Sequence, residues 1–336
     1  MSRIVLRSRL LQAILLATLG ITSARSADPL PSWNDGATKQ RIVEFVRSVT
    51  TVGGPDFVPV SKRIATFDND GTLWSEQPAY FQLQFSIHRT RKLIGSHPEW
   101  RTTQPFKAAL ENDLATLTSG NGKPFLALTA STLGGLTVTE MHAEVGEWLK
   151  SARHPRFQRP YTDLVFQPML ELLAYLKANR FKNYIVSGGD LEFMRAWATR
   201  VYGIPPERII GSRLKTQAVH RNGKPALLRL QEFEFFNNAE DKPISIRKFI
   251  GRRPIAAFGN SDGDLQMLQW TTIGSGKRLG AIVHHTDRKR EWSYDRRSRI
   301  GHLNKALDEA ARNKNRWTVV DMKRDWKVVY PFELAK

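Results

Sequence analysis

The sequence predicts an α/β fold in which a mostly parallel sheet carries helices on both faces and a helical unit is inserted after the first strand. Three observations lead to this prediction. Short apolar segments alternate with amphipathic helical segments over residues 163–320, as in parallel strands joined by crossover helices. Two apolar segments, at 64–67 and 255–258, run directly into turns rich in aspartate and glycine. Between residues 76 and 162 the apolar spacing is helical.

Each element of this fold follows from a local pattern. Apolar residues at every third or fourth position predict helices, and short apolar runs bounded by turn residues predict strands. Helices are expected at 38–49, 78–94, 98–117, 137–151, 168–179, 190–202, 243–250, 264–269 and 303–313. Strands are expected at 62–67, 181–189, within 207–230, at 254–259, 278–285 and 317–320. Residues 27–37 read as an extended leader and residues 153–161 as a linker.

Three local signals sharpen these boundaries. Thr137 followed by Glu140 forms a capping-box pattern at the start of a helix. Asp190 is the expected N-cap of the helix that follows it. Asn222-Gly223 predicts a hairpin turn between two strands. The chain is therefore divided into a core from 27–75 and 163–336 and a helical cap from 76–162.

The first 26 residues have the composition of an export signal. Three arginines (Arg3, Arg7 and Arg9) precede an apolar stretch at 10–22 that is too short to span a bilayer comfortably. Ala24 and Ser26 fit the small positions of a cleavage site, as do Thr22 and Ala24. We expect cleavage and a periplasmic or secreted protein without stable membrane insertion. An uncleaved membrane anchor is the alternative.

Charge and cysteine content limit the function classes. The formal net charge is +19, which attracts anionic partners. The sequence contains no run of five like charges, no zinc-finger spacing and no aromatic-rich RNA motif, so nucleic acid is not an expected partner. The cysteine count is zero, which excludes disulfides, thiol catalysis and cysteine metal ligands. Chemistry must rest on carboxylates, hydroxyls, imidazoles or amines.

Three of the predicted strands end in turns that carry polar or charged side chains and glycines. The first ends at Asp68 and Asp70, the second at 187–189 (Ser-Gly-Gly), and the third at 260–264 (Asn-Ser-Asp-Gly-Asp). Ligands bind at the carboxyl ends of parallel strands, so these groups are expected to converge. Two carboxylates as close as Asp68 and Asp70 repel each other, and a proton, a cation or nearby lysine and arginine must compensate.

The order of these motifs resembles the haloacid dehalogenase-like hydrolases. The family signature of a hydrophobic residue followed by Asp-x-Asp-Gly-Thr matches 67–72, and Ser187, Lys242 and the turn at 259–264 match its second, third and fourth motifs. The residues of the first and fourth motifs look most similar to the phosphoserine phosphatase-like branch, including exported bacterial acid phosphatases. The resemblance implies a Rossmann-like core with a cap inserted where residues 76–162 lie.

The resemblance also implies a role for each motif. Asp68 would be the nucleophile that forms an aspartyl-phosphate, and Asp70 the acid and base that serves the leaving group and the water. Ser187, the amides of Gly188 and Gly189, and Lys242 would hold the phosphoryl oxygens. Mg²⁺ would be the cofactor, bound by Asp68, the carbonyl of Asp70 and the third strand end. The substrate would be a small phosphate ester; Glu76 lies where substrate recognition begins in this branch, and oligomeric state stays open.

Two positions leave alternatives open. The family usually has an acid immediately after the glycine of the fourth motif, and here that residue is Asn260. Its amide carbonyl, or a carboxylate from Asp262, would complete the metal site, while Asp264 matches the second acid of the motif. For the third motif, Arg247 and Lys248 are alternatives to Lys242.

Rival functions use the same residues differently. A phosphotransferase would pass the phosphoryl group from Asp68 to an alcohol. A non-catalytic phosphate- or nucleic-acid-binding protein would fit the positive charge. A phosphonatase would need an imine-forming lysine in the cap, where Lys92 and Lys107 are the candidates.

Overall fold

The computed structural model describes residues 28–334. The proposed signal at 1–26 lies outside these residues. A single eight-stranded sheet forms the core, in the order β4-β3-β2-β1-β5-β6-β7, with β8 paired to β6. The strands are β1 (Ile64–Phe67), β2 (Lys182–Asp190), β3 (Ile209–Arg221), β4 (Lys224–Phe235), β5 (Ala256–Gly259), β6 (Leu279–Thr286), β7 (Ser293–Tyr294) and β8 (Trp317–Asp321).

Most of this sheet is parallel, as the sequence predicts. The pairs β1–β2, β1–β5, β2–β3, β5–β6 and β6–β8 are parallel, and β3–β4 and β6–β7 are antiparallel. Every residue of β1 and β5 is buried, which accounts for their continuous apolar sequence, because strands of a sheet covered on both faces have no solvent side. The predicted α/β fold is confirmed.

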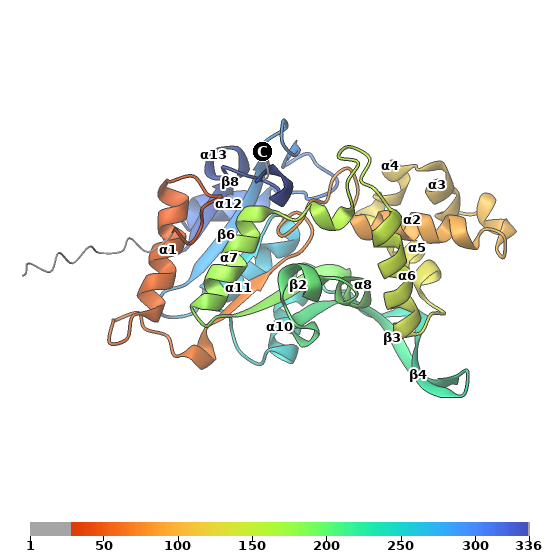
Figure 1. Ribbon diagram of the computed structural model, residues 1–336, viewed down its shortest axis with the longest axis horizontal. Coiled ribbons are helices and arrows are strands. Elements are labelled where there is room, and N and C mark those ends of the chain that lie inside the picture. Colours follow the sequence, from red (N-terminus) through yellow and green to blue (C-terminus); the bar gives the residue numbers. More distant parts are fainter. Residues whose placement is uncertain (1–27, 335–336) are drawn as a thin grey trace, which may run out of the picture.

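Helices cover both faces of the sheet (Figure 1). Along β5, the side chains of Ala256 and Phe258 join one apolar cluster and that of Ala257 joins the other, as alternation along a strand requires. The core helices are α1 (Ala37–Thr50), α7 (Gln167–Ala178), α8 (Leu191–Arg195), α9 (Ala198–Tyr202), α10 (Asp241–Phe249), α11 (Leu265–Thr272), α12 (Lys305–Arg312) and α13 (Met322–Asp325).

The first five α-helices between β1 and β2 gather at one end of the molecule, on the right in Figure 1. They are α2 (Phe81–Leu93), α3 (Phe106–Glu111), α4 (Leu114–Leu117), α5 (Lys123–Leu133) and α6 (Val138–Ser151). A separate apolar cluster, including Leu83, Trp100 and Leu128, packs among them. The β3–β4 hairpin reaches from the sheet to these helices, where Thr137 and Leu228 form a bridge.

Several predicted boundaries are wrong, and each has a local reason. The helix expected at 98–117 is broken because Asn112 adopts a left-handed conformation and Asp113 caps α4. Helix α5 was not expected; it contains no glycine, and Pro124 fits the first turn of a helix. The helix expected at 190–202 is divided at Trp197 into α8 and α9.

Other local signals are borne out. Thr137 and Glu140 form a complete capping box at the start of α6, and the side chain of Asp190 caps α8. Asn222 and Gly223 form the turn between β3 and β4. The leader at 27–37 is not free chain, because Leu30 and Trp33 are buried and Trp33 pairs with Trp326. In residues 28–334 no helix is long and apolar enough to cross a membrane.

Candidate active site

The loop after β1 is held by two long-range hydrogen bonds and closed by a tight glycine turn. The backbone N–H of Asp68 donates to the carbonyl of Phe258 on β5 (2.9 Å), and the carbonyl of Gly71 lies 2.8 Å from Nε2 of His285 on β6. Gly71 has φ +71°, and a Cβ there would lie 2.0 Å from Nδ2 of Asn260. Only glycine fits this turn, so the Asp-Gly step has a structural reason at this position.

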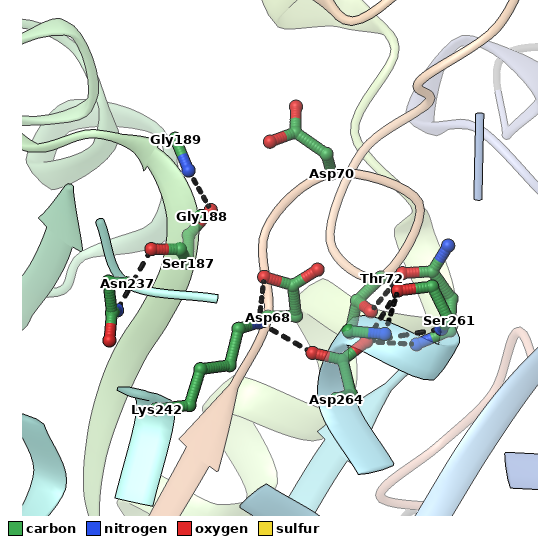
Figure 2. A network of polar contacts seen from close by, with 12 residues as sticks. Asp68, Asp70, Thr72, Ser187, Gly188, Gly189, Asn237, Lys242, Ser261 and Asp264 are labelled. Carbon is green, nitrogen blue, oxygen red and sulfur yellow. Dashed lines mark hydrogen bonds and ion pairs between the residues drawn. The ribbon is translucent and has the colours of Figure 1, made fainter. Parts of the chain in front are cut away.

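A buried lysine joins the first and third strand ends (Figure 2). Nζ of Lys242, in the first turn of α10, donates to Oδ1 of Asp68 (2.8 Å) and to Oδ1 of Asp264 (2.6 Å). Burial disfavours the charged ammonium, but the charges of Asp264 and Asp68 and their hydrogen bonds outweigh it and raise the pKa of Lys242. Lys242 therefore stays protonated and neutralises part of the cluster.

Asp264 shapes the turn of the third strand end. Its Oδ2 accepts the backbone N–H groups of Asn260 (3.0 Å) and Ser261 (3.1 Å). A Cβ at Gly259 would lie 2.5 Å from the Asp264 side chain, so the glycine of this motif makes room for the carboxylate. Because Asp264 also accepts from Lys242, it fixes both the turn and the lysine.

Asp70 is oriented away from the Asp68–Lys242 pair. Figure 2 shows its carboxyl group above and apart from that of Asp68. Its Oδ1 accepts from Nε1 of Trp74 (2.9 Å), and its Oδ2 would lie 3.6 Å from a Cβ on Gly189. Asp70 thus points from the loop after β1 toward the end of β2.

Burial shifts both carboxyl groups toward their protonated forms. Burial and repulsion by Asp264, partly offset by Lys242, raise the pKa of Asp68 to about 7. Burial, opposed by the hydrogen bond from Trp74, raises the pKa of Asp70 to about 6. The negative charges of these carboxylates are thus only partly neutralised by the protein. Asp70 is placed to carry a proton near neutral pH.

These shifts predict the pH dependence of stability in the metal-free protein. The folded state binds these protons more tightly than the unfolded state, so the free energy of unfolding falls as pH rises from about 4 to 7. Asp68→Asn should remove part of this fall. Thermal unfolding of both proteins in EDTA, between about pH 5 and pH 8, tests it; an identical pH dependence in the two proteins would contradict the prediction.

The end of β2 presents a hydroxyl group and backbone amides. Oγ of Ser187 accepts the N–H of Gly189 (3.0 Å), as Figure 2 shows. From behind, Nδ2 of Asn237 donates to the carbonyl of Ser187 (2.9 Å) and Oγ of Ser212 donates to that of Gly188 (2.7 Å). The segment 187–189 is therefore fixed by two side chains that no sequence motif indicated.

Asn260 is paired with Glu76. Nδ2 of Asn260 donates to Oε1 of Glu76 (2.7 Å), and Oδ1 of Asn260 accepts from Oγ1 of Thr72 (3.0 Å). Glu76 is 2% exposed and also accepts from the hydroxyl of Tyr294 (2.8 Å). Burial and repulsion by Asp70 and Asp68 raise the pKa of Glu76 well above its ordinary range. A carboxylate absent at position 260 is thus present beside it, contributed by the segment after the nucleophile loop.

This pairing predicts that the carboxyl group and the amide can exchange places, but that two carboxyl groups here are unfavourable. Asn260→Asp alone puts two buried carboxyl groups in contact, which must share one proton or repel each other, and should lower the free energy of unfolding by about 1–3 kcal/mol. Adding Glu76→Gln restores one donor and one acceptor, so the double variant should recover stability. Urea unfolding of the four proteins of this cycle measures the coupling; additive effects would show that the contact is unimportant.

Asp262 does not join the cluster. Its carboxylate accepts the backbone N–H groups of Asn304, Lys305 and Ala306 at 2.9–3.1 Å. Asp262 therefore caps the start of α12, and the expectation that it supplies the missing metal carboxylate is not met by this geometry.

The remaining residues of the prediction divide clearly. Asp68, Asp70, Ser187, Gly188, Gly189, Lys242 and Asp264 lie around one space at the carboxyl ends of β1, β2 and β5, with Asn260 and Glu76 beside them. Arg247 donates to the carbonyl of Gly251, and Lys248 lies over the ring of Phe249, so Lys242 is the lysine of the site. Lys92 is paired with Glu144 and Lys107 is exposed.

Sequence reasoning missed several supporting residues. Trp74 follows Asp70 by four positions, and that spacing was the available signal. Adjacent histidines on β6 have different partners: His284 contacts Asp295, and His285 contacts Gly71 and Glu291. The role of His285 in holding the nucleophile loop had no signal in the sequence, since 214 residues separate the partners.

The donor set fits a divalent cation. Asp68 and Asp264 are buried on either side of the Lys242 ammonium, Glu76 is buried beside Asn260, and Asp70 is half-buried on the same loop as Asp68. No group of three or more His, Cys, Asp or Glu side chains in residues 28–334 has the arrangement of a metal centre. Mg²⁺, however, needs only one or two carboxylates with carbonyls and waters. Oδ2 of Asp68 has no partner among the described residues, so excess negative charge and an available oxygen fit this cation.

A hairpin arginine connects the site to the inserted helices. Nη2 of Arg229 on β4 donates to Oδ2 of Asp190 (2.6 Å), and both side chains are 1% exposed. The backbone of Arg229 pairs with Gly135 and Leu136 in the loop before α6, and the N–H of Asp190 donates to Oε1 of Gln82 on α2 (2.6 Å). The segment 187–190 is therefore linked to β4 and to α2.

Comparisons with known proteins were made on the whole chain. A family model described as haloacid dehalogenase-like hydrolase matches residues 65–269, which include every motif of the site described above. Among curated proteins, none matches this chain.

Solved structures give distant similarities. A conserved protein of unknown function from Anaerococcus prevotii is 17% identical, with a TM-score of 0.49, over 83% of this chain and 91% of that one. A protein of unknown function from Bordetella pertussis is 16% identical, with a TM-score of 0.49, over 78% and 99%. A probable phosphoserine phosphatase from Vibrio cholerae is 16% identical, with a TM-score of 0.39, over 78% and 69%. At these identities the family assignment rests on the family model.

Proposed function

The chain belongs to the haloacid dehalogenase-like hydrolases, and from this premise we propose that it is a phosphomonoester hydrolase acting through an aspartyl-phosphate on Asp68. The observation that carries the proposal is the division of labour between two carboxyl groups. Asp68 has one oxygen held by Lys242 and one without a partner among the described residues. Asp70 is turned away from Lys242 toward β2, and its Oδ1 is held by Nε1 of Trp74 (2.9 Å). A nucleophile and a proton carrier are what a two-step phosphatase needs.

The first step forms a bond between a carboxylate oxygen of Asp68 and phosphorus. The bond between phosphorus and the ester oxygen breaks, and the leaving oxygen takes the proton of Asp70. In this proposal the hydroxyl of Ser187, the amide of Gly188 and the ammonium of Lys242 would hold the phosphoryl oxygens, which is supported by their position beside Asp68. Lys242 also offsets the charge of the Asp68 carboxylate before the ester arrives.

The second step regenerates the enzyme. Water attacks phosphorus and gives its proton to the Asp70 carboxylate, the bond between phosphorus and the Asp68 oxygen breaks, and inorganic phosphate leaves. A divalent cation, for which we propose Mg²⁺ held by Asp68, the carbonyl of Asp70 and Asn260 or Asp264, would neutralise phosphoryl charge when bound.

We propose that residues 76–162 act as the cap over this site. Supporting this, α2 to α5 share an apolar cluster separate from the main core, and Glu76 and Gln82 contact the motif loops from this segment. A cap would exclude bulk water while the aspartyl-phosphate forms. Because a cap of this kind would enclose the site, we also propose that the substrate is a small phosphate ester.

We propose that the protein is exported, on the basis of the basic and apolar composition of residues 1–26. Fractionation of cells that express the full chain, with N-terminal sequencing of the product, tests this. An intact N-terminus in the cytoplasm would contradict it.

Hydrolysis of 4-nitrophenyl phosphate tests the proposed reaction. We expect turnover with Mg²⁺, a loss of about 100-fold or more in EDTA, and recovery when Mg²⁺ is returned. Acid-quenched protein should carry a phosphoryl group on the peptide that contains Asp68. Turnover that is insensitive to EDTA, or a phosphoryl group on another residue, would overturn the proposal.

A further inference from the structure

A second cavity lies at the end of the sheet opposite the active site. Its volume is about 440 Å³, and it is lined by segments 55–62, 252–255 and 275–278. These segments lead into β1, β5 and β6, three neighbouring parallel strands. Since the carboxyl ends of β1 and β5 carry Asp68 and Asn260, the cavity is at the amino ends of the same strands and shares no residue with the catalytic cluster.

The lining of this cavity is strongly basic. It contains five cationic side chains and one acid, Asp56. The cations are Lys62, Arg252, Arg253, Lys277 and Arg278. None of the five forms an ion pair within residues 28–334. Their positive charge is therefore not neutralised by the protein around them.

Neutral groups hold two of these cations in place. The guanidinium of Arg278 donates to the carbonyls of Ser275, Pro254 and Thr271 at 2.8–2.9 Å, and that of Arg253 lies 3.7 Å from the ring centre of Trp270. Burial and the neighbouring Arg253 and Arg316 lower the pKa of Arg278. Two cations fixed beside each other, neither of them paired with an acid, favour a bound anion.

We propose that this cavity binds a small, multiply charged anion of the organic phosphate class. A volume of this size suits a small molecule, and the preformed cations reduce the ordering that binding would otherwise require. Phe57 and Ile255 give the wall an apolar portion, which would pack against the organic part of such a ligand. The inference does not depend on the catalytic proposal, because the two sites share no residue.

Isothermal titration calorimetry of the full chain with pyrophosphate and with ATP tests the site. The variant Arg252→Ala/Lys277→Ala removes two exposed cations of the lining, and Lys107→Ala/Arg200→Ala removes the same charge from exposed positions outside it. We expect the first variant to weaken binding of at least one probe by roughly tenfold and the second to change it by less than about twofold. The bound probe should also raise Tm in the wild-type chain and less in the first variant.

Other outcomes would overturn the proposal. Equal losses in the two variants would show that net charge alone attracts the anion. An absence of saturable binding by both probes would exclude a small-anion site. Binding of duplex DNA that depends on Arg252 and Lys277, without binding of either small probe, would make this surface a nucleic-acid site instead.

Discussion

Asp68→Asn is expected to abolish turnover while leaving the protein folded. The amide cannot act as the attacking carboxylate, so kcat should fall by roughly 10⁴-fold or more. Stability should not fall with it, because burial and Asp264 already disfavour the charge on Asp68 and Lys242 keeps its hydrogen bond to Asp264. Steady-state hydrolysis of an aryl phosphate, with thermal unfolding on the same samples, measures both effects.

Asp262→Asn is the matched control for this experiment. It makes the same chemical change in a carboxylate that contacts none of the proposed reacting groups and instead accepts backbone N–H groups at the start of α12. Asparagine is also a good capping residue, so activity and Mg²⁺ dependence should both persist. If Asp262→Asn inactivates the enzyme as Asp68→Asn does, the placement of the metal site given above is wrong.

Arg229→Ala is expected to cause the largest loss of stability. It leaves the carboxylate of Asp190 buried without its cationic partner, and removal of one member of a buried ion pair costs about 3–5 kcal/mol. Activity should fall as well, because Asp190 follows the Ser187–Gly189 segment directly and anchors Gln82 of α2. Urea unfolding gives the free energy, and kcat and KM for an aryl phosphate give the effect on the site.

Two further variants make this result interpretable. Arg221 lies in the same hairpin as Arg229, and Arg221→Ala breaks its ion pair with Glu140. Because these two side chains are 44% and 36% exposed, the free energy of unfolding should fall by less than about 1 kcal/mol. The double variant Arg229→Met/Asp190→Asn removes both buried charges and keeps a capping side chain, so part of the stability should return. Equal losses in Arg221→Ala and Arg229→Ala would contradict the importance of burial.

Local patterns in the sequence were sufficient for the parallel sheet and for most of the residues at its carboxyl end. Buried strands such as β1 and β5 have continuous apolar sequences, and the turns that follow them carry the reactive groups, so order along the chain predicts position in space. Lys242 was identifiable through the family motif. The short helices α3, α4, α8 and α9 were less predictable, because their ends depend on single residues such as Asn112 and Trp197.

The pairing of Asn260 with Glu76 shows what a sequence alone leaves open. Glycine, aspartate and asparagine at 259–264 identify a metal or phosphate turn, but they do not indicate which carboxylate faces the cluster. In the fold, Asp262 turns to α12, and Glu76 reaches Asn260 across 184 positions. The choice is made by hydrogen-bond donors that only packing brings near, namely the amides of α12 for Asp262 and the Asn260 amide for Glu76.

The amino-acid sequence by itself determined the α/β class, the location of the nucleophile and its partner acid, and the family, because these depend on short-range periodicity and on residues within a few positions of one another. Tertiary structure alone decided the direction of Asp70, the support from His285 and Arg229, and the basic cavity at the amino ends of the strands. Asp70 faces Gly189 on β2, His285 contacts Gly71, Arg229 contacts Asp190, and three separate segments line the cavity, so each of these joins parts far apart in the chain. Their energies come from burial and from charges brought together by folding, and neither quantity is defined until the chain has folded.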